Sequence, residues 1–463
     1  FVFMIRKYSG LLGFCIGACL TVSGQMAETA QTAPSPASRV WTLKECIDYA
    51  IEHNIEVRQR VLEKRNQELN VNTAQYSRLP DLNAGLGQNF YFGRGPGRDG
   101  TYQDQSQSSS SLDINTRVPV FSGFRVHHQI QMEKLNLQAA IAELDRAKED
   151  LSLNITSYFL QVLFNHELYR IAEEQVRLNR EQVERTEILV RGGKVPESEL
   201  FDARASLAKE ELNKTQAQNT LKLSLLDLSQ LLNLETVEGF EIEMPDIEHI
   251  LIEQIVHLMT PESVFTASVK NRPAVMAAEF RLRSSEKNLK IAKSAYYPQL
   301  SLGASYSNSY YHTYNLGEGG SNPSFSTQLS RNGSESVGLN LSIPIFNRMS
   351  TRNQVRSARI SIENQELMLE NMRQNLYKEI QQAYYNAVAA HEKYLSSEKS
   401  VEASRTAFRY EEQKYNAGRS TSYQFNDAKT RLAKSLSEAA QAKYDFIFRT
   451  KILDFYNGRP LDE

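Results

Sequence analysis

The chain has 463 residues and a formal net charge of −2 at pH 7. A charge this close to zero gives no reason to expect binding to nucleic acid or to an anionic membrane surface. The three cysteines exclude a disulfide framework, since Cys15 and Cys19 lie in a predicted export signal and Cys46 is left without an intrachain partner.

Residues 1–24 have the pattern of an export signal. A short positive region is followed by an apolar stretch, and small residues at 22–24 form a cleavage site. We expect cleavage after Gly24, with residues 25–40, rich in Ala, Ser and Pro, as a flexible tether. The alternative is a lipoprotein signal, because Ile16-Gly17-Ala18-Cys19 resembles a lipobox and would leave a lipid on Cys19.

Two short stretches predict β-strands that lead into long helices. Apolar and polar side chains alternate in Ser111–Phe121, and Gly338–Phe346 repeats the pattern. A period of two is typical of a strand with one apolar face. We expect Pro119 and Pro344 to mark the strand-to-helix junctions. No Gly or Pro then occurs over residues 124–191 and 345–417.

The first of these runs has the spacing of a coiled coil. Its apolar residues recur every seven positions, in two series that interleave at three and four. This spacing predicts a seam along which helices pack with left-handed supercoiling. At 1.5 Å per residue, each rod would be on the order of 100 Å long.

The chain is predicted to contain two tandem repeats. Pro119 and Pro344 lie 344 − 119 = 225 residues apart, and the same offset relates Gly193 to Gly418. We divide the chain into a first repeat at 41–232, a linker at 233–262, a second repeat at 263–458 and a tail at 459–463. Each repeat should hold a helix, two strands around a polar loop, a long helix and a return helix. The shorter helices are expected at residues 43–78, 272–297, 197–232 and 421–456.

The strand pattern favours a membrane β-barrel. One face is mostly Leu, Ile, Val and Tyr and the other mostly Gly, Ser and Asn, as in strands between lipid and a water-filled lumen. A soluble sandwich would fit the strands alone, but rods of ~100 Å leave no second sheet to cover the apolar face. Four strands cannot close in lipid. The barrel must therefore be shared, with eight strands from two chains or twelve from three.

The order of these features resembles that of TolC-like outer-membrane efflux proteins. The resemblance covers about residues 40–458 and rests on the junctions VPVFSG and IPIFNR and on the glycine turns GKVPESELFDA and GRSTSYQFNDA. It implies a mixed fold of membrane β-barrel and long α-helical coiled-coil barrel, with four strands per chain closed as a twelve-stranded barrel by trimerisation. It also implies the outer membrane of a Gram-negative bacterium, with a periplasmic helical extension.

Function and partners are implied by the same resemblance. The protein would be the exit duct of a tripartite efflux or type I secretion system, passing drugs, metals or exported molecules from an inner-membrane pump of the RND, ABC or MFS type. A periplasmic adaptor would join pump and duct, and outer-membrane lipid would surround the homotrimer. The alternative is a secreted or periplasmic structural coiled-coil or adhesin protein without channel activity.

Motifs for catalysis, cofactors or metals do not stand out. The sequence has no phosphate loop, GxSxG elbow or HExxH zinc motif. His127 and His128 could be a metal pair, but adjacent histidines at a helix start point in different directions. We therefore expect neither an enzyme nor a bound cofactor.

A periplasmic gate is implied at the turns of the long helices. Glu199 and Tyr415 match residues that hold the tips together in the family, and Arg419 is close enough in sequence to join them. Asp427 matches one of two carboxylates near the gate, while Gln424 stands in place of the other. The alternatives are ordinary solvated turn residues at the tips and, for Asp427, an aspartate on the helix surface.

The turns themselves are expected to dock the adaptor, because their residues are small or polar. Glycine at a helix end is also the usual cap with positive φ, so capping alone could explain the glycines. The residues concerned are Gly192, Gly193, Ala417, Gly418 and Ser420, of which Ser420 is expected to be exposed.

Overall fold

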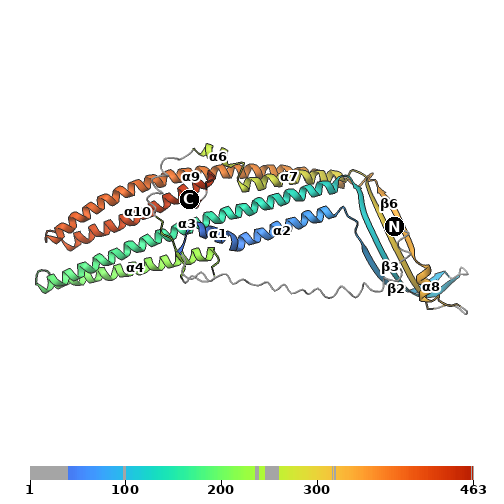
Figure 1. The fold of residues 1–463 in the computed structure, drawn as a ribbon, viewed down its shortest axis with the longest axis horizontal. Coiled ribbons are helices and arrows are strands. Elements are labelled where there is room, and N and C mark those ends of the chain that lie inside the picture. Colours follow the sequence, from blue (N-terminus) through green and yellow to red (C-terminus); the bar gives the residue numbers. More distant parts are fainter. Residues whose placement is uncertain are drawn as a thin grey trace.

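The computed structural model describes residues 40–96, 101–234, 239–245, 260–314, 316, 320–459 and 461. The predicted export signal, with Cys19, and all of the predicted tether except Val40 lie outside the described residues. Long helices run side by side from a four-stranded sheet at one end to two helical turns at the other (Figure 1).

The elements of the two halves follow one another in the same order. The first half contains α1 (Leu43–His53), α2 (Ile55–Tyr76), β2 (Asn83–Pro96), β3 (Tyr102–Ser122), α3 (Arg125–Arg191) and α4 (Glu197–Leu231). The second contains α6 (Pro261–Ser268), α7 (Pro273–Ser294), β5 (Gln299–Thr313), α8 (Phe325–Arg331), β6 (Ser334–Ser342), α9 (Ser350–Asn416) and α10 (Ser422–Tyr456). β1 (Val40–Trp41) and β4 (Glu241–Ile242) form a separate parallel pair.

The long helices and their return helices are duplicated without a change in length. α3 and α9 have 67 residues each, and α4 and α10 have 35 each. The boundaries of the second pair lie 225 positions after those of the first, as 350 − 125 and 456 − 231 show. The predicted duplication is confirmed.

The four long strands form one antiparallel sheet in the order β2–β3–β5–β6. Residues directly opposite each other share a face of a sheet, and the register brings side chains of one kind together. On one face Val118, Leu302 and Leu339 lie side by side across three strands, and on the other Arg117, Gly303 and Gly338 do so. The apolar face is therefore continuous, as the alternation predicted, and in the single chain it is uncovered, with Leu86 85% exposed.

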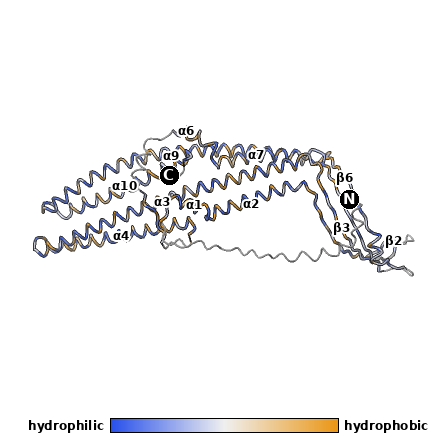
Figure 2. The backbone as a smooth tube through the Cα atoms, in the orientation of Figure 1, coloured by the Kyte–Doolittle hydropathy of each residue, from blue (hydrophilic) through white to orange (hydrophobic). Residues whose placement is uncertain are grey.

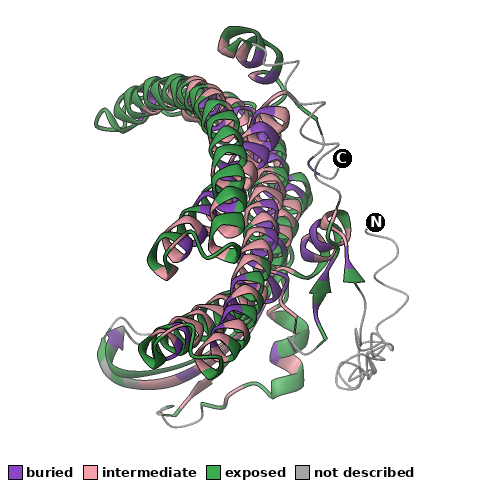
Figure 3. Cartoon of the chain, turned by 90° about the vertical axis from the view of Figure 1, so that its left-hand side faces the viewer, coloured by how far each residue is buried: buried purple, intermediate pink, exposed green. Residues whose placement is uncertain are grey.

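The helices form a curved layer, seen end-on in Figure 3. Near the sheet the order is α2, α3, α7 and α9, each in contact with the next, and near the turns it is α4, α3, α10 and α9. Buried residues lie mainly where neighbouring helices face each other. Apolar and polar residues are interspersed along the helices (Figure 2), and no helix in the described part of the chain has a stretch long and apolar enough to cross a bilayer.

Two helix columns are joined at mid-length by the residues that precede α2 and α7. Asn54 Nδ2 donates to the carbonyl oxygen of Leu231, at the end of α4, over 3.1 Å. Arg272 donates to the carbonyl oxygen of Phe455, near the end of α10, and pairs with Glu149 on α3 at 3.1 Å. As a result α2 continues the column of α4, and α7 continues the column of α10. The largest buried cluster lies at this level and includes Trp41, Ile155, Leu228, Phe240 and Phe446.

Several elements differ from what the sequence predicted. The helix expected over residues 43–78 is divided at Asn54, whose extended backbone and side-chain bond to the amide of Glu56 start a new helix. α8 lies in a segment predicted to be a polar loop, and β4 lies in the linker predicted to be irregular. Elements this short contain too few residues for a periodic signal.

Pro119 does not end its strand as predicted. β3 continues to Ser122, with a shift in register between Pro119 and Phe121. Pairing of β3 with β2 stops at Asn115, so β3 has a strand on one side only around Pro119, where a residue without an N–H is tolerated. Pro344 lies beyond the end of β6 at Ser342.

Each long helix is connected to its strand through two residues with positive φ. These are Gly123 (62°) and Phe124 (64°) in the first repeat, and Arg348 (54°) and Met349 (65°) in the second. An added Cβ at Gly123 would lie 2.6 Å from the carbonyl oxygen of Ser294 at the end of α7. The first junction is therefore packed so closely that it requires glycine.

Candidate functional site

The residues predicted to act in gating and docking lie at or beside the two helical turns farthest from the sheet. α3 and α4 form a first hairpin, connected by residues 192–196, and α9 and α10 form a second, connected by residues 417–421. Gly193 and Gly418 have φ values of +64° and +69°, and an added Cβ at either would meet no atom within 4 Å. Positive φ alone accounts for these two glycines, and both turns expose their backbone.

Glu199 and Tyr415 are brought together through a third residue, Ser422. The Ser422 hydroxyl, at the start of α10, donates to Glu199 Oε2 on α4 at 3.1 Å and lies 3.5 Å from the Tyr415 hydroxyl on α9. The Tyr415 ring stacks on Phe425, with ring centroids 4.7 Å apart, and this contact holds the ring in place. The three residues link the first hairpin to the second.

The cation beside Tyr415 is Arg185, not Arg419. The Arg185 guanidinium lies 5.3 Å from the centre of the Tyr415 ring and donates to the carbonyl oxygen of Asn416 at 3.2 Å. The Arg419 guanidinium is exposed and makes no hydrogen bond or ion pair within the described ranges. Arg185 comes from α3, so the contact crosses between hairpins, and no local motif in the sequence could have indicated it.

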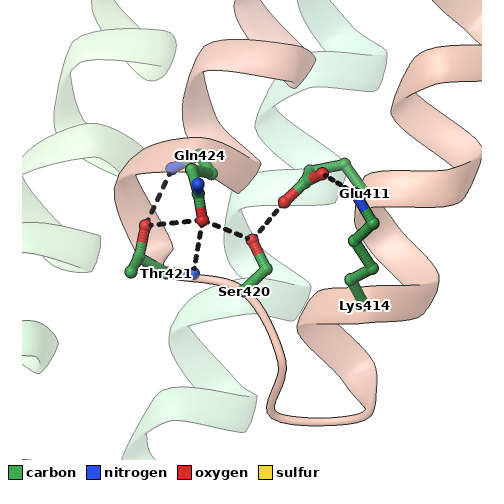
Figure 4. Close-up of polar contacts among 5 residues, drawn as sticks. All are labelled: Glu411, Lys414, Ser420, Thr421 and Gln424. Carbon is green, nitrogen blue, oxygen red and sulfur yellow. Dashed lines mark hydrogen bonds and ion pairs between the residues drawn. The ribbon is translucent and has the colours of Figure 1, made fainter.

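A network of polar side chains holds the α9–α10 turn (Figure 4). The backbone N–H of Gln424 donates to Thr421 Oγ1 at 3.2 Å, and the backbone N–H of Thr421 donates to Gln424 Oε1 at 3.2 Å. Together the two bonds form a capping box. Ser420 Oγ is hydrogen-bonded to Glu411 and Gln424, and Glu411 pairs with Lys414 at 3.2 Å. Ser420 is therefore half-buried and engaged in the turn, and the expectation that it is exposed was wrong.

Asp427 carries its own counter-charge. It lies on α10, and its carboxylate pairs with Arg431, one turn later, at 2.6 Å. Both side chains are exposed, so the pair contributes only about 0–1 kcal/mol to stability. The resemblance suggested a free carboxylate at this position, and the structure adds a guanidinium beside it.

A buried lysine that the sequence analysis did not single out also connects the hairpins. Lys429 on α10 is 5% exposed, and its Nζ donates to Asn179 Oδ1 at 2.7 Å and to Gln182 Oε1 at 3.1 Å, both on α3. Burial lowers the pKa of Lys429 to about 8, against a smaller opposing effect of Glu210. The sequence carries one signal for this contact, a row of polar residues along one side of α3 at spacings of four, three and four. All of them are buried: Gln175, Asn179, Gln182 and Thr186.

We expect the contact between the hairpins to become more stable as the pH rises from 8 to 10.5. The pKa of Lys429 is about 8 in the folded chain, against an ordinary value of 10.5. In this interval the folded state has released a proton that the opened or unfolded state still binds, so stability increases with pH, by on the order of 1–3 kcal/mol. Below pH 8 this group adds no pH dependence. Amide hydrogen exchange in α3 and α10 near the turns, corrected for the intrinsic effect of pH, measures the change.

Lys429→Met is the matched control, because methionine fills similar volume and has no titratable group. If the variant showed the same increase in protection between pH 8 and 10.5, another group would be responsible.

The two hairpins are joined at this site by hydrogen bonds and by the contact of the Arg185 guanidinium with the Tyr415 ring. Over the part of the chain that the structure describes, no group of three or more His, Cys, Asp or Glu residues could hold a metal ion. What these contacts can do is hold the hairpins together or, when broken, let them separate.

Comparison with known proteins connects this arrangement to a family. A family model described as outer membrane efflux protein matches residues 46–234 and 266–449. Outer membrane protein TolC of Escherichia coli K12 is 22% identical over 423 residues, which cover 89% of this chain and 81% of TolC. Cation efflux system protein CusC of Escherichia coli O157:H7 is 23% identical over 378 residues, which cover 77% of this chain and 74% of CusC.

Shorter matches and solved structures agree with this result. The chain spans less than half the length of two curated relatives, 42% of an uncharacterized protein of Haemophilus influenzae and 49% of toxin and drug export protein A of Aggregatibacter actinomycetemcomitans. The outer-membrane channel OprN has a TM-score of 0.72 at 20% identity, covering 91% of both chains. The CmeC outer membrane channel of Campylobacter jejuni has a TM-score of 0.73 at 15% identity, covering 90% of this chain and 85% of that one. At these identities the solved structures support the fold.

Proposed function

This chain belongs to the outer membrane efflux protein family, and from that premise we propose that three copies form an exit duct through the outer membrane and periplasm. The family is one of channel and transport proteins of the outer membrane. The observation that carries the proposal is the apolar face of the sheet, which runs across all four strands and is uncovered in the single chain. Lipid would cover that face, and the polar face would line a water-filled lumen.

The open edges of the sheet support closure with further copies. β2 and β6 each have a neighbouring strand on one side only, and each unpaired backbone group in lipid costs several kcal/mol. Three chains of four strands would close as a twelve-stranded barrel, wide enough for an aqueous passage.

The outermost helices support the same assembly. An apolar stripe recurs every seven residues along α2 and is between 60% and 65% exposed, and on α9 Ile360 and Leu367 repeat the spacing at 65% exposure. Stripes of this kind are seams on which a neighbouring helix packs. The α2 stripe consists of Ile55, Leu62, Leu69 and Tyr76.

The full chain, purified from outer membranes, tests the proposal by native mass spectrometry and planar-bilayer recording. We expect trimers and discrete ionic conductance. Leu62→Glu with Leu69→Glu should abolish both, because two charges per chain would be buried in the seam. Asn70→Glu adds a charge at an exposed polar position and should leave both unchanged. A wild-type chain that neither assembles nor conducts would overturn the proposal and favour the structural coiled-coil alternative.

We further propose that the helical turns receive a periplasmic adaptor, which connects the duct to an inner-membrane pump. Gly193 and Gly418, with open space around them, and the exposed Arg419 guanidinium support docking at this surface. Relatives are named for toxin and drug export and for cation efflux, and the cargo of this chain would follow from an RND, ABC or MFS pump. Co-purification after cross-linking in native membranes would identify that pump.

We also propose the division into a first repeat at 41–232, a linker at 233–262 and a second repeat at 263–458.

At the N-terminus we propose cleavage after Gly24, and the alternative is lipidation of Cys19. A relative, SilC of Salmonella typhimurium, is named a probable outer membrane lipoprotein. Mass spectrometry of the mature N-terminus would distinguish a free Gln25 from an acylated Cys19.

We expect Asp427 to favour cations in the passage and Arg431 to weaken that preference. A ring of three carboxylates in a narrow aqueous passage attracts cations, and each carboxylate has a guanidinium 2.6 Å away. Asp427→Asn should therefore move the reversal potential in asymmetric KCl towards zero, and Arg431→Gln should move it the other way. If neither substitution changed the reversal potential, Asp427 would lie outside the passage.

A further inference from the structure

The short helix α8 replaces a strand at the end of the sheet farthest from the long helices. β6 pairs with β5 only as far as Ser334 opposite Ser307, although β5 continues to Thr313. Three amide side chains from α8 and its flanks pair with the backbone of β5 that β6 leaves free. Gln328 bonds the N–H and carbonyl of Tyr311 at 2.9 and 2.8 Å, Asn322 bonds those of Thr313 at 3.0 and 2.8 Å, and Asn332 bonds the carbonyl of Ser309 at 2.6 Å.

These bonds give α8 a defined position on the apolar face of the sheet. Asn308 lies opposite Leu112 in the register and so belongs to that face. Its Nδ2 donates to the carbonyl oxygen of Leu329 on α8 at 2.8 Å, and the ring of Tyr310, on the same face, contacts the ring of Phe325 with centroids 5.2 Å apart. α8 therefore covers the outward-facing surface at this level, and it does not fill the lumen.

The position of α8 coincides with a change in the chemistry of that face. Along β3, the aliphatic Ile114 and Leu112 are followed on the same face by Ser110 and Ser108, while on β2 Phe90 lies opposite Ser108 and Phe92 opposite Ser106. The face therefore changes from aliphatic residues to a mixture of polar and aromatic ones. On β6 the change is marked by Glu335, which lies opposite Tyr306. A membrane boundary has this pattern, with an aliphatic band below and aromatic and polar residues mixed at the interface.

Two apolar side chains of α8 are exposed, together with Ser326, Ser330 and Arg331. Phe325 and Leu329 are four residues apart, on one side of the helix, and are 57% and 47% exposed. In the sequence this segment belongs to the polar loop of the second repeat, where the chain is longer than in the first. The additional residues thus form a structured element, and its Phe325 ring extends the apolar face beside Tyr310.

We propose that α8 lies in the outer leaflet of the membrane and that Phe325 and Leu329 contact lipid at the headgroup boundary. This proposal rests on the proposed function, because it requires the apolar face to be the lipid-facing one. Amphipathic helices and aromatic girdles take this position in membrane proteins. The backbone bonds to β5 anchor the helix, so its apolar side chains set the depth at which the barrel stays in the bilayer.

The single tryptophan of the chain makes a direct test possible. Trp41 lies at mid-length, where its ring contacts Tyr49 and Phe240, and Trp41→Phe retains an aromatic ring there. In this background Phe325→Trp or Leu329→Trp reports on α8 in bilayers of phosphatidylcholine brominated either near the headgroup or deep in the acyl chain. We expect loss of tryptophan emission in both variants, greater with shallow than with deep bromines.

Two further positions make each outcome decisive. Leu86→Trp, on the apolar face, should be quenched, and Tyr423→Trp, 80% exposed at the helical turns, should not. Quenching at Leu86 without quenching at Phe325 or Leu329 would overturn the proposal and mean that α8 faces water or a neighbouring copy. Absence of quenching at Leu86 would instead contradict the proposed barrel. Retained trimers on native gels show that a variant has folded.

Discussion

Replacing Gly123 with alanine should prevent the chain from assembling. The new Cβ would lie 2.6 Å from the carbonyl oxygen of Ser294 and 2.8 Å from Cβ of Tyr297. Neither atom can be moved by rotation of a side chain. Overpacking of this kind costs about 1–3 kcal/mol, and a non-glycine residue at φ +62° costs about 1–2 kcal/mol more. The junction would have to move away from α7, and with it the connection between sheet and long helix. The yield of trimers extracted from outer membranes measures the effect.

Gly193→Ala is the matched control for this substitution. Its φ is +64°, nearly the same as at Gly123, but nothing lies within 4 Å of the added Cβ. It should cost only the strain of about 1–2 kcal/mol and leave assembly intact. Equal losses in the two variants would assign the effect to backbone strain, and normal assembly of Gly123→Ala would mean that the junction can shift.

The second large effect is expected at the predicted gate, where Ser422→Ala should raise the resting conductance as much as Glu199→Ala combined with Tyr415→Phe. The Ser422 hydroxyl is the atom that both partners approach, at 3.1 and 3.5 Å. Both contacts are partly buried, and one hydrogen bond of this kind contributes about 1 kcal/mol. Loss of one such bond in each of three copies would change the balance between closed and open forms by roughly a hundredfold. Conductance in planar bilayers and sensitivity to bulky antibiotics provide the measurement.

Additivity tests whether the three residues act as a unit. Adding Ser422→Ala to the double variant should change little, because residues in one hydrogen-bond network are not independent. Arg419→Ala should leave conductance unchanged, whereas Arg185→Ala, which removes the cation beside Tyr415, should raise it. An increase from Arg419→Ala alone, or full additivity, would place the gate elsewhere.

Much of the fold followed from periodicity. The long helices and the alternating strands each extend over many residues, and the two glycine turns repeat at a fixed offset. The spacing of apolar, Gly and Pro residues along the chain is therefore enough to predict them. The division at Asn54 could not be predicted in this way, because it depends on a single cap, the bond from the amide of Glu56 to the Asn54 side chain, and on no repeating pattern. The second bond of that side chain, to Leu231, is far away in sequence. β1 and β4 have two residues each, and their pairing is equally remote.

The site was predicted in part, for a related physical reason. Glu199 and Tyr415 lie near each other, but the residue that joins them, Ser422, is one of many serines and has no distinguishing context. Arg185 and Lys429 make contacts between hairpins, which depend on how α3 packs against α10. Arg419 was predicted as the cation beside Tyr415 because the two residues are close in sequence, and the sequence alone does not show which residues of other helices lie near the turn.

The equal lengths of the two hairpins restrict how this protein can change in length. A deletion of seven residues preserves the heptad register of one helix, but it shortens that helix by about 10 Å. Made in α3 and α4 alone, such a deletion would leave the first tip short of the second and make the rim of the tube uneven. Insertions and deletions would therefore have to occur together in α3, α4, α9 and α10, which keeps the two hairpins at one length although the loops of the two repeats differ.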